Sequence, residues 1–340
     1  MEKPNGIRLT VIAVAITTSM TLIWSIGLIS KGIWQLSQAK QVGLNSKNIP
    51  NFAGVPNVTT GVFNYGGSTA WASLRLAVDS VIQSERPEIQ FRYVQPKNEP
   101  PGTSPGIGML LEGQLAFVQS SHALRPQEYQ LAEQKGLKLK QVPVAVNGLV
   151  VAVHPKLNIP GLTFSQLQAI YTGKISNWQE VGGADLPITA YSRPASTGGM
   201  VDFFVSKILQ DREFGSNVEF ISTTTQALRQ VANNPGSIYY GSAPAIIPQC
   251  TIKPLPIGDK EDFVAPYQQP LITTSECPQR RNQPNIRALR TARYPLTHYL
   301  YVVFLQNEND KSQIGQAYAD FLLTPQGQKL IAKTGFVPLD

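Results

Sequence analysis

The most informative part of the chain is the stretch GLTFSQLQAIYTGKISNWQEVGG, residues 161–183. Within it, Phe164–Tyr171 carries apolar side chains at helical spacing and predicts one amphipathic helix. A strand-like run at Leu149–Val153 precedes this helix, and a second strand-like run at Ile188–Tyr191 follows it. Strand, helix and strand in this order are typical of an α/β lobe.

The same alternation extends in both directions from this stretch. On the N-terminal side it comprises Val62–Tyr65, Trp71–Gln83, Ile89–Val94, Ile107–Leu111, Leu115–Val118 and Pro126–Gln134. On the C-terminal side it comprises helices at Met200–Leu209 and Thr225–Ala232, a strand at Tyr299–Phe304, and helices at Ile314–Leu323 and Pro325–Lys333. Two such series predict two α/β lobes, and 340 residues with 42% hydrophobic residues are enough for two cores.

The chain is basic, but its charge is not concentrated. The formal net charge is +7, of which residues 1–40 contribute +3, leaving +4 for the rest. Beyond residue 40, arginines gather only at Arg280, Arg281, Arg287, Arg290 and Arg293. We interpret this cluster as a solvated surface, with a docking patch as the alternative, and expect no nucleic-acid partner.

An uncharged segment, Leu9–Ser30, lies near the N-terminus. As a helix it would be about 33 Å long and could cross a hydrocarbon core of about 30 Å. Residues 1–8 would then be a cytoplasmic n-region. A cleaved secretory signal is the alternative, but the apolar stretch is long for one and Ser25-Ile26-Gly27 is a weak cleavage site. We therefore expect residues 9–30 to be a retained transmembrane anchor.

Under both interpretations the rest of the chain is exported. Residues 31–56 carry Asn, Gly and Pro without periodicity and are expected to form a linker. The protein would then be a single-pass protein of the cell membrane, with its C-terminal domain facing the periplasm or the cell exterior.

The chain has two cysteines, Cys250 and Cys277, both far from the N-terminus and therefore unsuitable for a lipid anchor. In an oxidising compartment we expect them to form a disulfide, and two unpaired thiols are the alternative. With only His122, His154 and His298 as histidines, we expect no metal site and no cofactor.

Three segments place glycine, serine and threonine just before predicted helices: Gly66–Thr69, Gly102–Gly106 and Arg193–Gly199. A helix N-terminus offers unsatisfied N–H groups and positive partial charge, glycine lets an anion approach, and hydroxyls add donors. Each segment alone is typical of ordinary capping, but their recurrence favours an oxyanion site. Arg193 adds a guanidinium that can make bidentate bonds to an oxyanion, the alternative being a surface arginine.

Residues 161–183 resemble the pattern LT.QL..I..GKI.NW..VGG of the phosphate-binding proteins of ABC importers, which have the type II periplasmic binding fold. An arginine and a Thr-Gly-Gly turn follow at the expected distance. The segments Gly236–Tyr240, Tyr294–Thr297 and Phe321–Gly327 are also similar to that family. The resemblance covers roughly residues 61–340.

The resemblance implies a two-lobed fold with two crossover strands as the hinge. Lobe one would comprise residues 57–143 and 296–340, and lobe two residues 144–295. A monomer of this kind would close around inorganic phosphate and deliver it to permease subunits of an ABC importer in the membrane.

The resemblance also implies ligand contacts, position by position. They are Ser68 and Thr69 in the first loop, Thr103 and Ser104 in the second, Ser121 after a strand, and Arg193, Thr197, Gly198 and Gly199 in the third loop. Two positions depart from the best-known members, because Ser121 and Ala195 stand where those proteins have acids. An acceptor carboxylate receives the proton of monohydrogen phosphate and repels sulfate. Sulfate exclusion is therefore expected to be weaker, unless Asp202 or Glu112 reaches the cleft.

Three functions are alternatives to phosphate transport. A membrane-anchored oxyanion sensor or scaffold, or a binder of another oxyanion such as sulfate, would use the same fold. A serine phosphoesterase would need a nucleophile with a base and usually metals, and neither a His–Ser pairing nor a carboxylate cluster is evident. We therefore expect a binding protein and not an enzyme.

Overall fold

The computed structural model describes residues 49–194, 199–259, 262–307 and 309–339. The expected membrane segment, residues 9–30, lies outside the described residues. Among the helices that are described, none combines the length and the apolar character that crossing a membrane requires.

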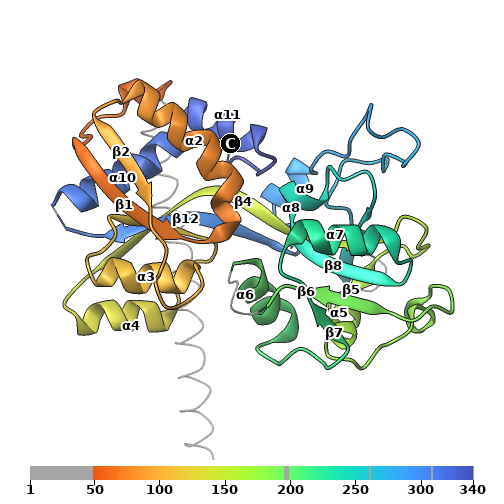
Figure 1. Cartoon of the computed structure of the whole chain (residues 1–340). Coiled ribbons are helices and arrows are strands. Elements are labelled where there is room, and N and C mark those ends of the chain that lie inside the picture. The colour runs from red at the N-terminus through yellow and green to blue at the C-terminus, as the bar shows by residue number, and fades with distance from the viewer. Residues whose placement is uncertain (1–48, 195–198, 260–261, 308, 340) are drawn as a thin grey trace, which may run out of the picture.

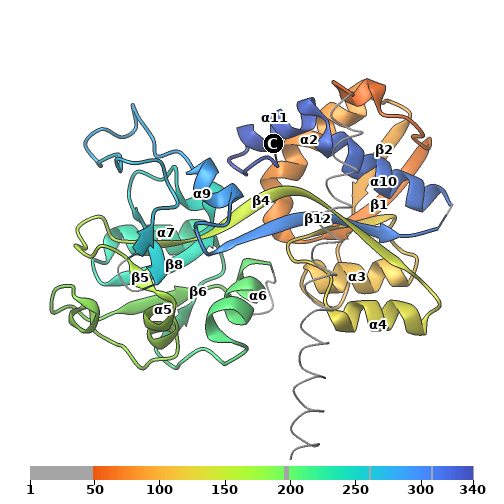
Figure 2. The same ribbon diagram turned by 180° about the vertical axis from the view of Figure 1, so that it is seen from behind.

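Two α/β lobes stand side by side and are joined by two long central strands, β4 (Leu139–Val153) and β12 (Thr297–Leu305) (Figure 1). The strand order of the main sheet is β2-β1-β3-β12-β4-β8-β6-β7, so the joined pair lies in the middle. β12 pairs antiparallel with β3 of one lobe, and β4 pairs antiparallel with β8 of the other. Seen from behind, β4 and β12 cross together from lobe to lobe (Figure 2). The expected boundary between residues 143 and 144 falls inside β4.

Lobe one contains both chain ends of the described structure. Its elements are β1 (Gly61–Gly67), α2 (Ala72–Glu85), β2 (Ile89–Tyr93), α3 (Thr103–Leu111), β3 (Phe117–Ser120), α4 (Pro126–Gln134), α10 (Asp310–Leu323) and α11 (Pro325–Lys333). β1 pairs in parallel with β2 and β3, as the predicted alternation of strands and helices requires. α2, α10 and α11 help to bury one aromatic-rich core that includes Trp71, Phe117 and Phe321.

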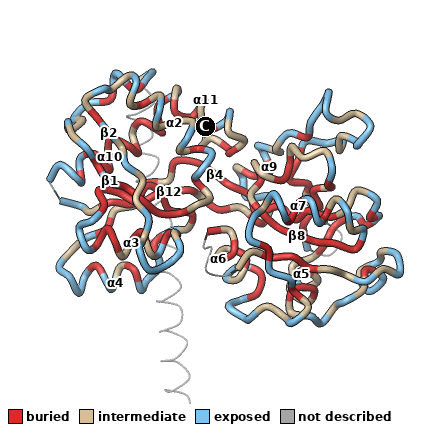
Figure 3. The backbone as a smooth tube through the Cα atoms, in the orientation of Figure 1, coloured by how far each residue is buried: buried red, intermediate tan, exposed pale blue. Residues whose placement is uncertain are grey.

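Lobe two contains the rest of the described chain. Its elements are β5 (Leu162–Thr163), α5 (Phe164–Tyr171), β6 (Thr189–Ser192), α6 (Met200–Phe204), β7 (Val218–Phe220), α7 (Thr224–Asn233), β8 (Ser237–Ser242), α8 (Ala243–Ile246), β9 (Lys253–Leu255), β10 (Ile257–Asp259), β11 (Asp262–Val264) and α9 (Ile286–Arg290). β6 pairs in parallel with β7 and β8. In both lobes the buried residues follow the strands, and exposed residues follow the outer loops (Figure 3).

The stretch 161–183 forms the frame of lobe two. Thr163 and Gln166 make a capping box that starts α5, as expected for a helix over Phe164–Tyr171. The α5 face buries Leu167, Ile170 and Tyr171. Tyr171 OH donates to the Tyr191 carbonyl at 3.1 Å, which ties α5 to the end of β6. The most specific part of the sequence therefore packs within lobe two and is tied to β6.

Two predicted segments differ from the structure in detail. The helix expected over Met200–Leu209 is α6 followed by a π-helical turn at Val205–Leu209. The expected linker extended to residue 56, but Phe52 is fully buried and its N–H donates to Gln326 Oε1 at 2.8 Å. Packing therefore begins before residue 57, because isolated apolar residues between Asn, Gly and Pro give no periodic signal.

Cys250 and Cys277 form the expected disulfide, which closes a peripheral loop with a sequence separation of 27. Replacing both residues by serine removes the loop-closure constraint on the unfolded chain. We expect the free energy of unfolding to fall by about 2–4 kcal/mol, the usual range for removing a cross-link that closes a loop of this length. Urea denaturation of wild type and double variant measures this loss. Equal midpoints and slopes would contradict it.

Candidate functional site

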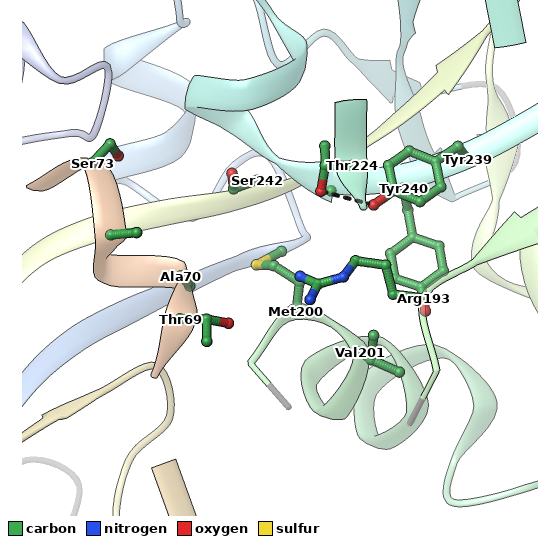
Figure 4. A pocket seen from close by; sticks show the side chains of 12 residues that line it. Thr69, Ala70, Ser73, Arg193, Met200, Val201, Thr224, Tyr239, Tyr240 and Ser242 are labelled. Carbon is green, nitrogen blue, oxygen red and sulfur yellow. Dashed lines mark hydrogen bonds between the residues drawn. The ribbon is translucent and has the colours of Figure 1, made fainter. Parts of the chain in front are cut away.

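A cavity of about 240 Å³ lies between the two lobes (Figure 4). Lobe one contributes Thr69, Ala70, Ala72 and Ser73, and lobe two contributes Arg193, Met200, Val201, Thr224, Tyr239, Tyr240, Gly241 and Ser242. Its size suits a small inorganic anion, and its lining includes one guanidinium and several hydroxyls. No carboxylate belongs to its described lining, and the residues 195–198, whose structure is not described, are Ala-Ser-Thr-Gly.

The first predicted loop lies at the end of β1 and forms one wall of this cavity. Ser68 is buried, and its Oγ accepts the N–H of Ala70 at 3.2 Å, which caps the 3₁₀ turn Thr69–Trp71. The N–H of Ser68 donates to the Gln119 carbonyl at 2.7 Å. Thr69, a predicted ligand contact, lines the cavity, whereas Ser68, also a predicted contact, is buried outside its lining and caps the turn.

Thr103 of the second predicted loop forms a buried pair of hydroxyls with Ser121, which follows β3. Thr103 Oγ1 lies 3.3 Å from Ser121 Oγ and accepts the Ser121 N–H at 3.1 Å. A Cβ on Gly199 would lie 3.2 Å from Ser68 Oγ and 3.8 Å from Ser121 Oγ. At Gly199, the third loop of lobe two thus lies close to the first loop and to Ser121, the residue that pairs with Thr103. The structure brings these predicted residues together.

The Ser104 side chain points away from Ser121, although the sequence predicted Ser104 and Thr103 as contacts of the same ligand. Its Oγ donates to Glu128 Oε1 at 3.0 Å, and Glu128 also lies 3.2 Å from His122 Nε2. Ser104 lines a separate interlobe groove of about 690 Å³ that also contains Arg125 and Asp202. Consecutive residues at a helix start point in different directions, so only Thr103 faces Ser121.

Arg193 follows β6 directly and extends its side chain into the cavity toward Thr69 (Figure 4). Its Nε is buried and has no hydrogen-bond partner within the described parts of the chain. A buried guanidinium donor without a partner is costly, so it marks a place where an anion would be stabilised. Thr197 and Gly198 lie outside the described residues.

Two tyrosines surround the base of Arg193. Tyr240 OH lies 2.7 Å from Ser192 Oγ, and Tyr239 OH lies 3.1 Å from Thr224 Oγ1. Burial raises the pKa of both tyrosines above the ordinary value, although the charge of Arg193 acts in the opposite direction. Both hydroxyls are therefore protonated at neutral pH.

Neither acid considered from the sequence lines the cavity. Glu112 follows α3, is exposed, and accepts a hydrogen bond from Gln114 Nε2 at 2.7 Å. Asp202 lies in the separate groove, where burial raises the pKa of its carboxyl and the charges of Arg125 and His122 lower it. Within the described parts of the chain, no group of three or more His, Cys, Asp or Glu side chains could hold a metal ion.

A family model for the PBP superfamily domain matches residues 54–326. This chain belongs to the PBP superfamily. The match covers both lobes and the crossover strands between them, and it agrees with the two-lobed fold.

Curated relatives of this superfamily protein are phosphate-binding proteins. "Phosphate-binding protein PstS" of Bacillus subtilis (strain 168) is 29% identical over 184 residues, 53% of this chain and 57% of that protein. The Staphylococcus aureus (strain USA300) protein of the same name is 23% identical over 240 residues, 69% of this chain and 67% of that protein. The chain thus spans little more than half the length of the first of these relatives.

Solved structures show the same fold as this superfamily member. A candidate phosphate ABC transporter substrate-binding protein from Clostridium perfringens, crystallised with bound phosphate, has a TM-score of 0.64 and 23% identity, covering 82% of this chain and 100% of that one. An ABC-type phosphate transport receptor from Vibrio cholerae has a TM-score of 0.64 and 20% identity, covering 81% of this chain and 99% of that one.

The sequence reading of this superfamily protein missed several residues of the cavity, namely Ser73, Thr224, Tyr239, Tyr240 and Ser242. Tyr239 and Tyr240 belong to the Gly236–Tyr240 segment, which the sequence associated with the fold and not with the ligand. No local signal identifies them, because side chains alternate across a strand and consecutive tyrosines would be expected on opposite faces. That both border the cavity beside Arg193 follows only from the packing of β8 beside β6.

Proposed function

We propose that this chain is an extracytoplasmic solute-binding protein that captures inorganic phosphate between its lobes and delivers it to an ABC importer. One observation carries the proposal: the buried Arg193 Nε faces a small interlobe cavity and lacks a partner among the described residues. The phosphate named for the curated relatives supports the choice of anion.

Donors from both lobes would bind the anion. Thr69, Thr103 and Ser121 would donate from lobe one, with Ser68 orienting the first loop. Arg193 would make bidentate charge-assisted bonds from lobe two, and Thr197, Gly198 and Gly199 would add hydroxyl and backbone donors. Ser104, whose hydroxyl bonds to Glu128, is not part of this proposed set.

Binding would act through closure of the two lobes. Because each lobe supplies only some of the donors, an anion binds most tightly when both lobes contact it, and it shifts the population toward the closed form. β4 and β12 form the proposed hinge, since they are the central strands that pass between lobes. No covalent step is part of this mechanism.

The location and partners are proposed from the N-terminal sequence. Residues 9–30 would anchor a monomer in the cell membrane, with the two-lobed part outside the cytoplasm and near the permease subunits. The same tether suits a sensor or scaffold that reports the anion to a neighbouring membrane protein. Delivery to a permease is favoured because two solved structures with the same fold are described as an ABC transporter substrate-binding protein and an ABC-type phosphate transport receptor.

Sulfate is the second candidate ligand, and one observation favours it. The described lining of the cavity holds no carboxylate, and the four residues from 195 to 198 are not acidic. A fully ionised anion therefore meets no buried negative charge there. Discrimination would have to come from the arrangement of hydroxyl acceptors, which is weaker than repulsion by a carboxylate.

We expect phosphate to bind more tightly than sulfate, by about fivefold, because one hydroxyl acceptor for the phosphate proton contributes about 1 kcal/mol. Isothermal titration of the full-length chain in mild detergent with phosphate, arsenate, sulfate and molybdate measures this ratio. Equal affinity for sulfate and phosphate would contradict phosphate selectivity. Heat release with none of the four anions would refute the oxyanion site.

A further inference from the structure

Behind the first loop, a chain of hydrogen bonds joins four elements of lobe one. Arg75 Nη1 donates to Gln119 Oε1 at 3.1 Å, and Gln119 Nε2 donates to Tyr318 OH at 2.8 Å. Tyr318 OH in turn donates to Asp79 Oδ1 at 2.8 Å, and Tyr65 OH donates to the other carboxylate oxygen. Gln119 and Tyr318 are fully buried.

The two ends of this chain fix the direction of every bond in it. A guanidinium can only donate and an ionised carboxylate can only accept, so Arg75 sets the amide orientation of Gln119. Asp79 likewise sets the hydroxyl direction of Tyr318. All bonds then point from the cation to the anion, and aligned bonds in a buried site strengthen one another. Arg75 and Asp79 lie four residues apart on α2, one helical turn.

This chain of bonds ends at the proposed anion loop in two places. The backbone carbonyl of Gln119 accepts the Ser68 N–H at 2.7 Å. Tyr93 OH donates to the Gly67 carbonyl at 2.9 Å, and the Arg75 guanidinium lies 3.6 Å from the centre of the Tyr93 ring. The bonds therefore hold both residues that precede Thr69, although neither Asp79 nor Tyr318 lines the cavity.

We propose that Arg75, Gln119, Tyr318 and Asp79 form a positioning network for the Gly67–Thr69 loop, and that full anion affinity requires Asp79 to be ionised. The inference rests on the proposed anion site and adds a regulation of it by pH. Its residues act through the loop, so they are positioning residues and do not contact the anion.

The charge state of Asp79 is set by the groups that face it. Burial raises the pKa of its carboxyl to about 6, while hydrogen bonds from Tyr65 of β1 and Tyr318 of α10 and the charge of Arg75 on its own helix lower it. Above about pH 6 the carboxylate accepts from both tyrosines. Below that pH a proton occupies one acceptor position, so one bond is lost and the loop is held less firmly. Affinity should therefore fall as the pH drops through 6.

The test compares phosphate affinity of wild type, Asp79→Asn and Tyr318→Phe from pH 5 to pH 8, by calorimetry on the full-length chain. At pH 8 we expect each variant to bind about tenfold more weakly, because a loosened loop must be ordered when the anion binds, and an ordering cost of about 1.4 kcal/mol is tenfold in affinity. The ratio of dissociation constants, Asp79→Asn to wild type, should approach 1 at pH 5. Phosphate's own titration cancels in this ratio.

Tyr129→Phe is the matched control, because Tyr129 is a partly buried tyrosine of α4 in lobe one that packs in the cluster around α3. The affinity of this variant should equal that of wild type. Tyr93→Phe removes only the bond to Gly67 and keeps the proposal testable if Asp79→Asn fails to fold; it should weaken binding about threefold. If Asp79→Asn, Tyr318→Phe and Tyr93→Phe all had the dissociation constant of wild type at every pH, the positioning role would be overturned while phosphate binding remained intact. Absence of binding by wild type would instead overturn the anion site itself.

Discussion

Arg193→Ala is expected to weaken phosphate binding by at least about 100-fold, the largest effect of any single substitution in the cavity. Charge-assisted hydrogen bonds contribute about 1.5–3 kcal/mol each, and a bidentate guanidinium makes two of them. The Arg193 Nε has no partner among the described residues, so its loss removes a donor that only the ligand would use. Calorimetric titration of the full-length variant with phosphate measures the change.

Two further arginine variants sharpen this test. Arg193→Lys keeps the charge but not the planar fork, so its affinity should lie between those of wild type and Arg193→Ala. Arg229→Ala removes an exposed arginine of α7 in the same lobe and should leave the affinity unchanged. If Arg193→Ala bound phosphate as tightly as wild type, the anion would have to lie elsewhere.

Gly67→Ala is expected to lower the free energy of unfolding by about 4 kcal/mol, because the loop leaves no space for a side chain. Gly67 has a φ of +116°, and an added Cβ would lie 2.3 Å from the Gln119 carbonyl oxygen and 2.8 Å from Val118 Cγ1. The first of these neighbours is backbone of the paired strand and cannot rotate away. Relief of the clash would move Ser68 and Thr69, so phosphate affinity should fall as well.

Gly108→Ala is a matched control within the same lobe. Gly108 lies on α3, and no atom lies within 4 Å of the position that a Cβ would take. Alanine in a helix interior is favoured over glycine, so this variant should be more stable by about 0.5–1 kcal/mol. Thermal and urea unfolding of both variants give the two changes. Equal stability of Gly67→Ala and wild type would refute the steric argument.

The local and repeating features of this protein could be predicted from its sequence. The helix over Phe164–Tyr171 and the helix over Pro325–Lys333 were recovered with their bounds, because the spacing of apolar residues and the capping residues are local signals. The loops at Ser68, Thr103 and Arg193 were also selected from local sequence, because glycine and hydroxyl residues recur before three predicted helices, although each loop alone is typical of ordinary capping.

Which partner each of those side chains contacts depends on the tertiary structure. Ser104 and Thr103 are neighbours in sequence, yet one bonds to Glu128 and the other to Ser121. The cavity residues Tyr239 and Tyr240 reach Arg193 through the pairing of β8 with β6. Neither outcome is a property of a short window of sequence.

The sequence by itself determined two α/β lobes, three donor-rich loops and the arginine that begins the third loop, because periodicity and capping act over a few residues. Only the tertiary structure decided which hydroxyls face the interlobe cavity, that no described carboxylate does, and that Asp79 supports the first loop. Tyr318 lies 199 residues from Gln119 and 239 from Asp79 along the chain. Single contacts over such separations depend on how whole elements pack, and no local pattern records them.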